Sequence, residues 1–180
     1  VVDATPTEGD WQDLAFEFDN HYYTLPFAYE ELAANGWTLD DSDYDAKQGY
    51  VLNPKDTSYS YLVTNSAYED VTVFISFYNP SDEIKDITEC EVYRFYYDSG
   101  RSYYEDDPTH YYPNMNVDMG PCIGMDKDTV LSYMGKCEDV YKASGYSSYY
   151  YNSEDYSKSV DFDLYKKYGI TSISLTAYPD

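Results

Sequence analysis

The sequence has few basic residues and no long hydrophobic run. Its 180 residues include 11 Lys and Arg against 34 Asp and Glu, which gives a net charge of −23 at pH 7. Nucleic acids and anionic membrane surfaces repel so acidic a chain, so we expect neither as a partner. No stretch approaches the roughly 20 apolar residues of a membrane-spanning helix, and we expect no membrane insertion of this segment.

Histidine and cysteine are also scarce. Two histidines and three cysteines are present, without any CxxC pair, so we do not expect a zinc site. The odd number of cysteines excludes complete pairing. Cys122 and Cys137 flank a predicted helix, and a disulfide between them is left open because spacing does not give the distance between their Cα atoms. If they pair, Cys90 is a buried free thiol.

The chain lacks the motifs of the common catalytic sites. Neither His21 nor His110 is accompanied by the spacing of a nucleophile elbow or a catalytic triad. The alternating carboxylates at 40–45 resemble the start of a calcium loop. However, Ala46 and Leu52 stand where that loop needs Gly and Glu, so we expect no metal and no cofactor. A cryptic hydrolase that uses two of the many carboxylates is the least favoured alternative.

Tyrosine is the residue that the sequence has in excess. There are 26 tyrosines, against 7 phenylalanines and 2 tryptophans. An interior of ordinary size cannot hold them all, because each buried phenol needs a hydrogen-bond partner. One interpretation is that tyrosine simply suits β-strands. The other is that many rings form a recognition surface, since tyrosine offers a large contact area at low entropy cost.

Runs of adjacent tyrosines supply the candidate binding residues. Neighbours in a strand point to opposite faces, so each pair places one ring on the outside. We therefore predict a non-catalytic module that binds a protein through a tyrosine-rich sheet face, with a carbohydrate or cell-wall glycan as the alternative partner. The candidates are Tyr96, Tyr97, Tyr103, Tyr104, Tyr111, Tyr112, Tyr149, Tyr150 and Tyr151.

Two stretches have the pattern of helices. Residues 24–37 carry Pro26 where a first helical turn would begin and Gly36 as a left-handed stop. Residues 123–135 have apolar residues at helical spacing and end at Gly135 in the same way.

Most of the remaining periodic stretches predict strands joined by short turns, which favours an antiparallel sheet. The expected fold is α+β, with helices on one face of the sheet, and a helix-plus-meander unit used twice is one arrangement that fits. The expected strands are a hairpin at 14–25, then 59–65, 71–79, 87–97, 139–143, 147–152, 159–166 and 170–178. The expected organisation is a disordered spacer at 1–12, a first α+β unit at 13–98, an ordered connecting loop at 99–119 and a second α+β unit at 120–180.

The first of these units resembles a group of secreted lipoproteins from gut Firmicutes. The resemblance lies in a YTLP segment at 23–26, Gly36-Trp37, a YVLNP strand at 50–54 and a DITEC segment at 86–90. It implies an extracellular, surface-anchored protein. The polar opening at 1–10 agrees, since it looks like a spacer that follows an anchor or leader.

The second unit resembles the repeat of the β-lactamase-inhibitor-protein-like and small outer-membrane lipoprotein domains. The matching positions are 123–125, 130–131, Gly135 and the strand at 170–175, while Cys137 stands where that repeat usually has proline. This likeness implies the α+β fold and a role in binding or structure. It does not transfer any inhibitory activity.

Overall fold

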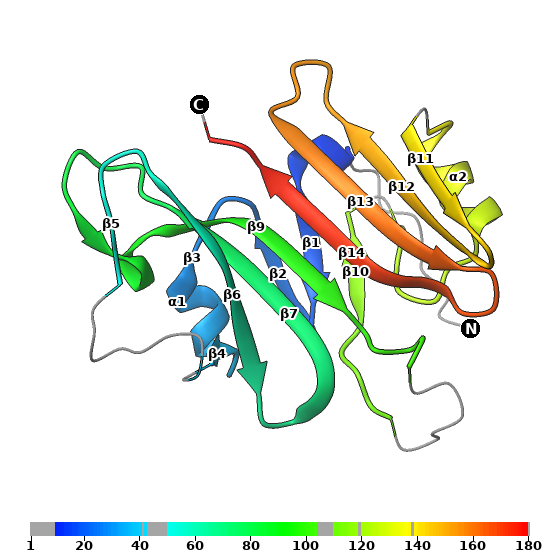
Figure 1. The fold of residues 1–180 in the computed structure, drawn as a ribbon, viewed down its shortest axis with the longest axis horizontal. Helices are drawn as coiled ribbons and strands as arrows, with labels where there is room; N and C mark the ends of the chain where they lie inside the picture. The colour runs from blue at the N-terminus through cyan, green and yellow to red at the C-terminus, as the bar shows by residue number, and fades with distance from the viewer. Residues whose placement is uncertain are drawn as a thin grey trace.

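The computed structural model describes residues 10–40, 42, 50–103, 110–118, 120–137 and 139–179. A large antiparallel sheet of nine strands forms one layer of the molecule (Figure 1). A second layer lies behind it in that view and contains a three-stranded sheet and two short helices.

The large sheet has the strand order β11-β12-β13-β14-β9-β7-β6-β4, and β3 pairs separately with β9. All of these pairings are antiparallel. The strands are β3 (Phe27–Ala28), β4 (Thr38–Leu39), β6 (Thr57–Asn65), β7 (Tyr68–Tyr78), β9 (Glu91–Asp98), β11 (Asp139–Ala143), β12 (Tyr146–Asn152), β13 (Lys158–Tyr165) and β14 (Gly169–Ala177).

The small sheet has the order β10-β1-β2, and a separate two-stranded ribbon joins β5 to β8. These elements are β1 (Ala15–Phe18), β2 (His21–Thr24), β5 (Val51–Leu52), β8 (Lys85–Asp86) and β10 (Met115–Val117). The helices are α1 (Tyr29–Ala34) and α2 (Lys127–Met134), with short 3-10 turns η1 (Trp11–Asp13) and η2 (Ile87–Glu89).

The two layers meet in an aromatic core. Alternation along β1 turns Phe16 and Phe18 inward, where both are fully buried. The Phe18 ring contacts three buried rings at centroid distances of 5.1, 5.0 and 4.9 Å, those of Phe95, Tyr97 and Trp37. Contacts of this kind stabilise the core beyond the area that they bury.

The predicted hairpin at 14–25 is confirmed. Asp19 and Asn20 connect β1 to β2, and both have positive φ angles, 51° and 64°. Two central residues with positive φ are the requirement of the tight turn that matches the twist of paired strands.

The two predicted helices are present, but both are shorter than expected. A cis Leu25–Pro26 bond and β3 precede α1, so Pro26 does not begin the helix. Gly36 has a φ of +86° and supplies the predicted left-handed stop. The second helix begins after Asp126, whose carboxylate accepts a 2.9 Å hydrogen bond from the Thr129 amide, and it ends at Gly135.

The predicted α+β class is wrong, and the fold is β-rich. Strands account for 50% of the structure and helical turns for 13%. Each helix buries a single residue, Leu32 in α1 and Val130 in α2. The second layer is made chiefly by the small sheet, because its inward-facing aromatic and aliphatic residues cover the large one. One sheet also runs through both predicted units, since β14 pairs with β9.

The three cysteines are free thiols. Cys122 and Cys137 are therefore not bridged, which answers the alternative that the sequence left open. Cys90 and Cys122 are buried, and Cys137 donates from Sγ to the carbonyl oxygens of Asp139 and Tyr150, both at 3.1 Å.

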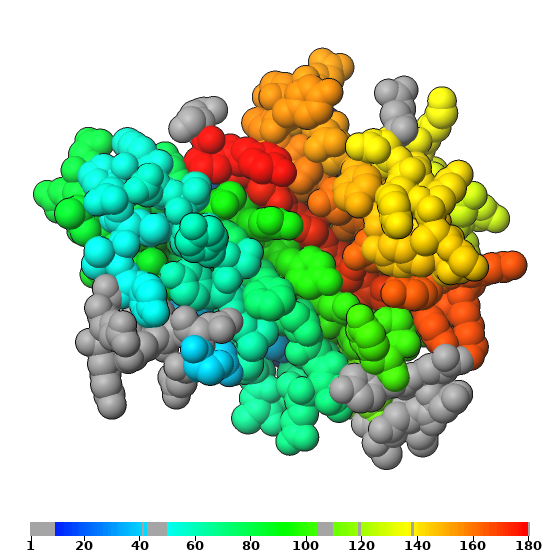
Figure 2. Space-filling model, in the orientation of Figure 1, coloured from blue at the N-terminus to red at the C-terminus, as the bar shows by residue number. Residues whose placement is uncertain are grey.

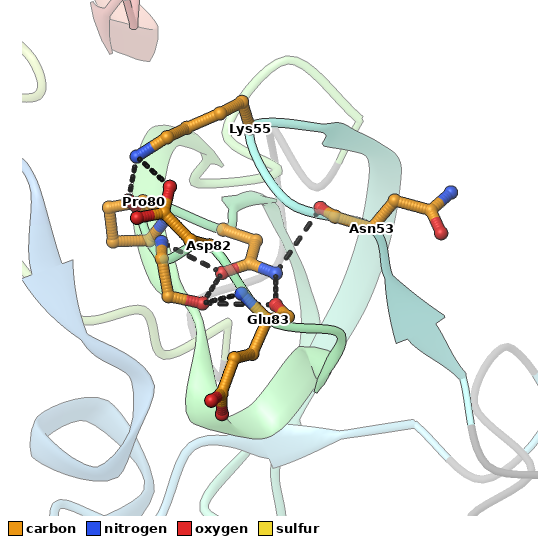
Figure 3. Close-up of polar contacts among 7 residues, drawn as sticks. Asn53, Lys55, Pro80, Asp82 and Glu83 are labelled. Carbon is orange, nitrogen blue, oxygen red and sulfur yellow. Dashed lines mark hydrogen bonds and ion pairs between the residues drawn. The ribbon is translucent and has the colours of Figure 1, made fainter.

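A buried amide joins the loops at one end of the large sheet (Figure 3). Asn79 is completely buried, and its Oδ1 accepts hydrogen bonds from the amide and the hydroxyl of Ser81. Its Nδ2 donates to three main-chain carbonyls at 3.0, 3.2 and 2.7 Å, those of Leu52, Asn53 and Glu83.

Candidate functional site

We call the face of the large sheet that turns away from the second layer the outer face. It is the face toward the viewer in Figures 1 and 2, where β14 shows as a narrow red band between its green and orange neighbours. Alternate residues of four adjacent strands point to it. They are Tyr146, Ser148 and Tyr150 of β12, Asp161, Asp163 and Tyr165 of β13, Ser172, Ser174 and Thr176 of β14, and Arg94, Tyr96 and Asp98 of β9.

Four tyrosines form a continuous series of ring contacts at one end of this face, and we call them the tyrosine ladder. The ring of Tyr141 on β11 contacts Tyr146, Tyr146 contacts Tyr165, and Tyr165 contacts Tyr168 in the following turn. The successive centroid distances are 6.3, 5.0 and 6.2 Å. Tyr141 is 57% exposed and the other three are half-buried. The ladder is thus a partly exposed aromatic surface with contributions from three strands.

Asp163 connects the ladder to the rest of the outer face. Its Oδ1 accepts hydrogen bonds from the Tyr146 phenol at 2.7 Å and the Ser148 hydroxyl at 2.6 Å, and its Oδ2 accepts one from Ser172 at 2.7 Å. Burial raises the pKa of Tyr146 to about 12, so this phenol stays a neutral donor at physiological pH. Asp163 therefore fixes the position of a ladder ring.

A second row of side chains crosses the outer face beside the ladder. The strand register places Tyr150 opposite Asp161, Asp161 opposite Ser174, and Ser174 opposite Tyr96. Directly paired residues of antiparallel strands have Cβ atoms about 5 Å apart, so these four side chains are immediate neighbours. We call them the central row.

Asp161 differs from Asp163 in having no hydrogen-bond donor among the described residues. Its pKa is raised to about 6, chiefly by burial and to a smaller extent by the carboxylates of Asp163 and Asp139, while the Arg94 guanidinium opposes the rise. Arg94 acts from a distance, because no ion pair with Asp161 forms within the described part of the chain. A carboxyl group that is half-buried and unpaired is a recognised mark of a functional site.

Two further groups complete the polar surface around the central row. The hydroxyl of Ser174 is buried, 6% of the residue is exposed, and its Oγ has no hydrogen-bond partner. Burial also raises the pKa of Asp98, which accepts a 2.9 Å hydrogen bond from the Gly100 amide. The outer face thus combines phenols and hydroxyls with several carboxylates and one guanidinium.

A cavity of about 590 Å³ lies at the edge of the ladder, between the start of α2 and the ends of β12 and β13. Tyr146 and Tyr165 line it together with Leu164. Its lining includes Lys127 and Lys166 together with Asp126 and Asp128, so its positive and negative charges balance.

The structure separates the tyrosines predicted from the sequence into two groups on the strands. Tyr96 and Tyr150 lie on the outer face, in the central row. Tyr97, Tyr149 and Tyr151 point into the core and are buried, so they present no surface to a partner. This division follows the alternation that the paired tyrosines predicted.

Three of the remaining predicted tyrosines are described, and none of them belongs to the ladder. Tyr103 is exposed in the turn after β9, and Tyr104 lies outside the described residues. Tyr111 is exposed and stacks on Tyr68 at 5.3 Å, while Tyr112 is half-buried. Burial, Asp98 and, to a lesser extent, Tyr103 raise the pKa of Tyr96, so Tyr103 lies near the central row, whereas Tyr111 contacts Tyr68 instead.

The ladder, Asp161 and Ser174 were not among the residues predicted from the sequence. A usable signal was present in residues 159–165, Ser-Val-Asp-Phe-Asp-Leu-Tyr, where polar and apolar residues alternate strictly. Such alternation places Asp161, Asp163 and Tyr165 on one face of a strand. It does not reveal which residues of the neighbouring strands lie beside them.

Within the described residues, no group of three His, Cys, Asp or Glu side chains could hold a metal ion. Most of the acidic turn at 40–52 lies outside them. Neither helix of the described ranges has the length and hydrophobicity needed to span a bilayer. In comparisons with known proteins, no family model, curated protein or solved structure matches this chain.

Proposed function

We propose that this chain is a non-catalytic, cell-surface module that binds a protein through the outer face of its large sheet. The tyrosine ladder is the observation that supports this proposal. Its four rings already touch one another, so a partner that binds there immobilises little additional side-chain freedom. Tyrosine is also among the residues most enriched at protein interfaces and at their energetic centres.

The tilt of the rings favours a protein over a glycan. Successive rings of the ladder make interplanar angles of 63°, 58° and 53°. A sugar chain stacks its flat faces on coplanar rings, which this arrangement does not offer. Side chains of a protein, by contrast, fit between tilted rings and reach their edges and hydroxyls.

The hydrogen bonding of Asp163 supports the non-catalytic part of the proposal. Hydrolysis by two carboxylates needs both of them to reach the substrate, one as the acid and the other as the base or nucleophile. Asp161 and Asp163 are the neighbouring carboxylates beside the ladder, and both oxygens of Asp163 already accept hydrogen bonds. The proposed surface location rests on the resemblance of residues 14–97 to secreted lipoproteins and of residues 120–178 to the repeat of the β-lactamase-inhibitor-protein-like and small outer-membrane lipoprotein domains.

A selection from displayed random dodecapeptides tests the proposal, with a glycan array in parallel. We expect selected peptides that bind the double variant Tyr141→Ala, Tyr165→Ala at least about tenfold more weakly, since interface tyrosines commonly contribute more than 1 kcal/mol each. The matched control is Tyr22→Ala, Tyr59→Ala, which removes two tyrosines that are 75% and 91% exposed outside the ladder.

Circular dichroism and thermal unfolding serve to check that both double variants fold. Peptides that bind both variants equally well would refute the outer face as the binding site. Ladder-dependent glycan binding without any ladder-dependent peptide would replace the protein by a carbohydrate as the partner.

A further inference from the structure

The outer face offers hydrogen-bond acceptors that the protein itself does not use. Asp163 and Asp161 lie two residues apart on the same face of β13. The first accepts three hydrogen bonds from hydroxyl groups, whereas the second accepts none from the described residues. Asp163 thus has a structural role, and the carboxylate of Asp161 remains available to a partner.

Ser174 gives an independent indication at the same place. It lies directly opposite Asp161 in the pairing of β13 with β14, and its side chain points to the same face. Its Oγ is buried and has no hydrogen-bond partner. Buried hydroxyls without partners are rare, and one beside an unpaired carboxylate indicates a ligand position.

The charged groups around Asp161 indicate whether that ligand is cationic or anionic. The carboxylates of Asp163 and Asp139 both act on Asp161, and Arg94 is the opposing cation. The outer face is therefore net negative, within a chain whose net charge is −23. An anionic group would be repelled here, and a cationic group would relieve the repulsion among the carboxylates.

We propose that the protein partner presents a lysine or arginine side chain to the central row, where its cationic head binds the carboxylate of Asp161. This inference rests on the proposed function of the outer face. The strand register places Tyr150 and Tyr96 on either side of this position, and a phenol ring attracts a cation. The same head group would satisfy the unpartnered Oγ of Ser174 if a flanking side chain moved aside.

A fluorescent octalysine peptide tests the proposal on the whole chain, with octaglutamate as the opposite-charge probe. Asp161→Asn keeps the shape of the side chain and removes its charge. Glu30→Gln is the matched control, because Glu30 is exposed on α1, in the second layer. We expect Asp161→Asn to weaken octalysine binding about tenfold or more, because it removes a hydrogen bond to a charged group. Glu30→Gln should change the binding less than about twofold. Octaglutamate should not bind.

Equal losses in the two variants would overturn the proposal, because octalysine would then respond to the overall charge alone. The displayed peptides test the proposed function separately from the cationic contact. Ladder-dependent peptides without lysine or arginine, and with no sensitivity to Asp161→Asn, would refute the cationic contact while leaving protein binding intact. The absence of any ladder-dependent peptide would refute both.

Discussion

Replacing Asp161 by asparagine should make the folded protein more stable at neutral pH, although it removes a charge from a strongly acidic chain. Burial is the largest influence on this carboxyl group and raises its pKa from 3.8 to about 6. The folded state therefore disfavours the ionised form, which predominates at pH 7. An amide of the same shape has no such charge to bury.

The size of the effect follows from the pKa. A difference of about two units corresponds to about 3 kcal/mol, at about 1.36 kcal/mol per unit. Asp161 is only half-buried, so water screens part of this energy, and we expect Asp161→Asn to raise the free energy of unfolding by about 1–2 kcal/mol at pH 7.5.

The pH dependence has a defined sign. Because the folded pKa lies above the unfolded one, the folded state holds more protons between about pH 4 and pH 6, and its stability falls as the pH rises through that window. Asp163, Asp139 and Arg94 are the charged groups that act on Asp161 across the window. The stabilisation of Asp161→Asn should thus be small near pH 4, grow up to about pH 6 and then remain constant.

Urea unfolding of both proteins between pH 4.5 and pH 8 measures this difference, and the other titrating groups cancel in the comparison. Glu30→Gln, at an exposed position, should give a nearly flat difference over the same range. A variant less stable than the parent at pH 7.5 would refute the reasoning, since it would mean that attraction to Arg94 outweighs the effect of burial.

Two further predictions concern the framework that carries the outer face. Asn79→Ala removes the buried side-chain amide that donates to three main-chain carbonyls, and it should lower the free energy of unfolding measured in urea by about 3 kcal/mol. A loss below about 1 kcal/mol would show that the loops hold together without these hydrogen bonds. Gly169 and Gly145 both have positive φ angles, +72° and +77°, but a Cβ on Gly169 would lie 2.3 Å from the Gly124 carbonyl oxygen, while one on Gly145 meets nothing within 4 Å. Gly145→Ala should therefore lower the free energy of unfolding by about 1–2 kcal/mol, through backbone strain alone. Gly169→Ala should lower it clearly more, and equal losses of stability in the two variants would contradict the close approach at Gly169.

Local features of the fold could be predicted from the sequence because they depend on neighbouring residues. The Asp19–Asn20 hairpin, the left-handed Gly36 and the strand-forming stretches all belong to this class. The fold class could not be predicted, because it depends on what covers the large sheet. The hairpin at 15–24 has the same alternation whether it joins that sheet or packs across it. The Phe16–Phe95 contact across 79 residues decides between the two.

The candidate site was predictable to a similar degree. The Tyr96-Tyr97 pair correctly implied one ring outside and one inside. The ladder, however, is created by strand register, which brings Tyr146 beside Tyr165 from across a hairpin. A shift of either strand by one residue would have turned its ring into the core. Composition showed that tyrosines are in surplus, but register decides which of them meet.

The contrast between Asp161 and Asp163 connects stability to function. The two carboxylates share a strand, a face and an acidic environment, yet only Asp163 is satisfied by neighbouring hydroxyls. If stability were the only requirement, a neutral residue at position 161 would be favoured, because it would raise the free energy of unfolding. If Asp161→Asn both stabilises the protein and weakens octalysine binding, the buried charge is a property of the binding face, as in other proteins whose functional sites are destabilising. If it stabilises the protein without affecting binding, the cationic contact lies elsewhere, and Asp161 is an uncompensated charge with no role in recognition.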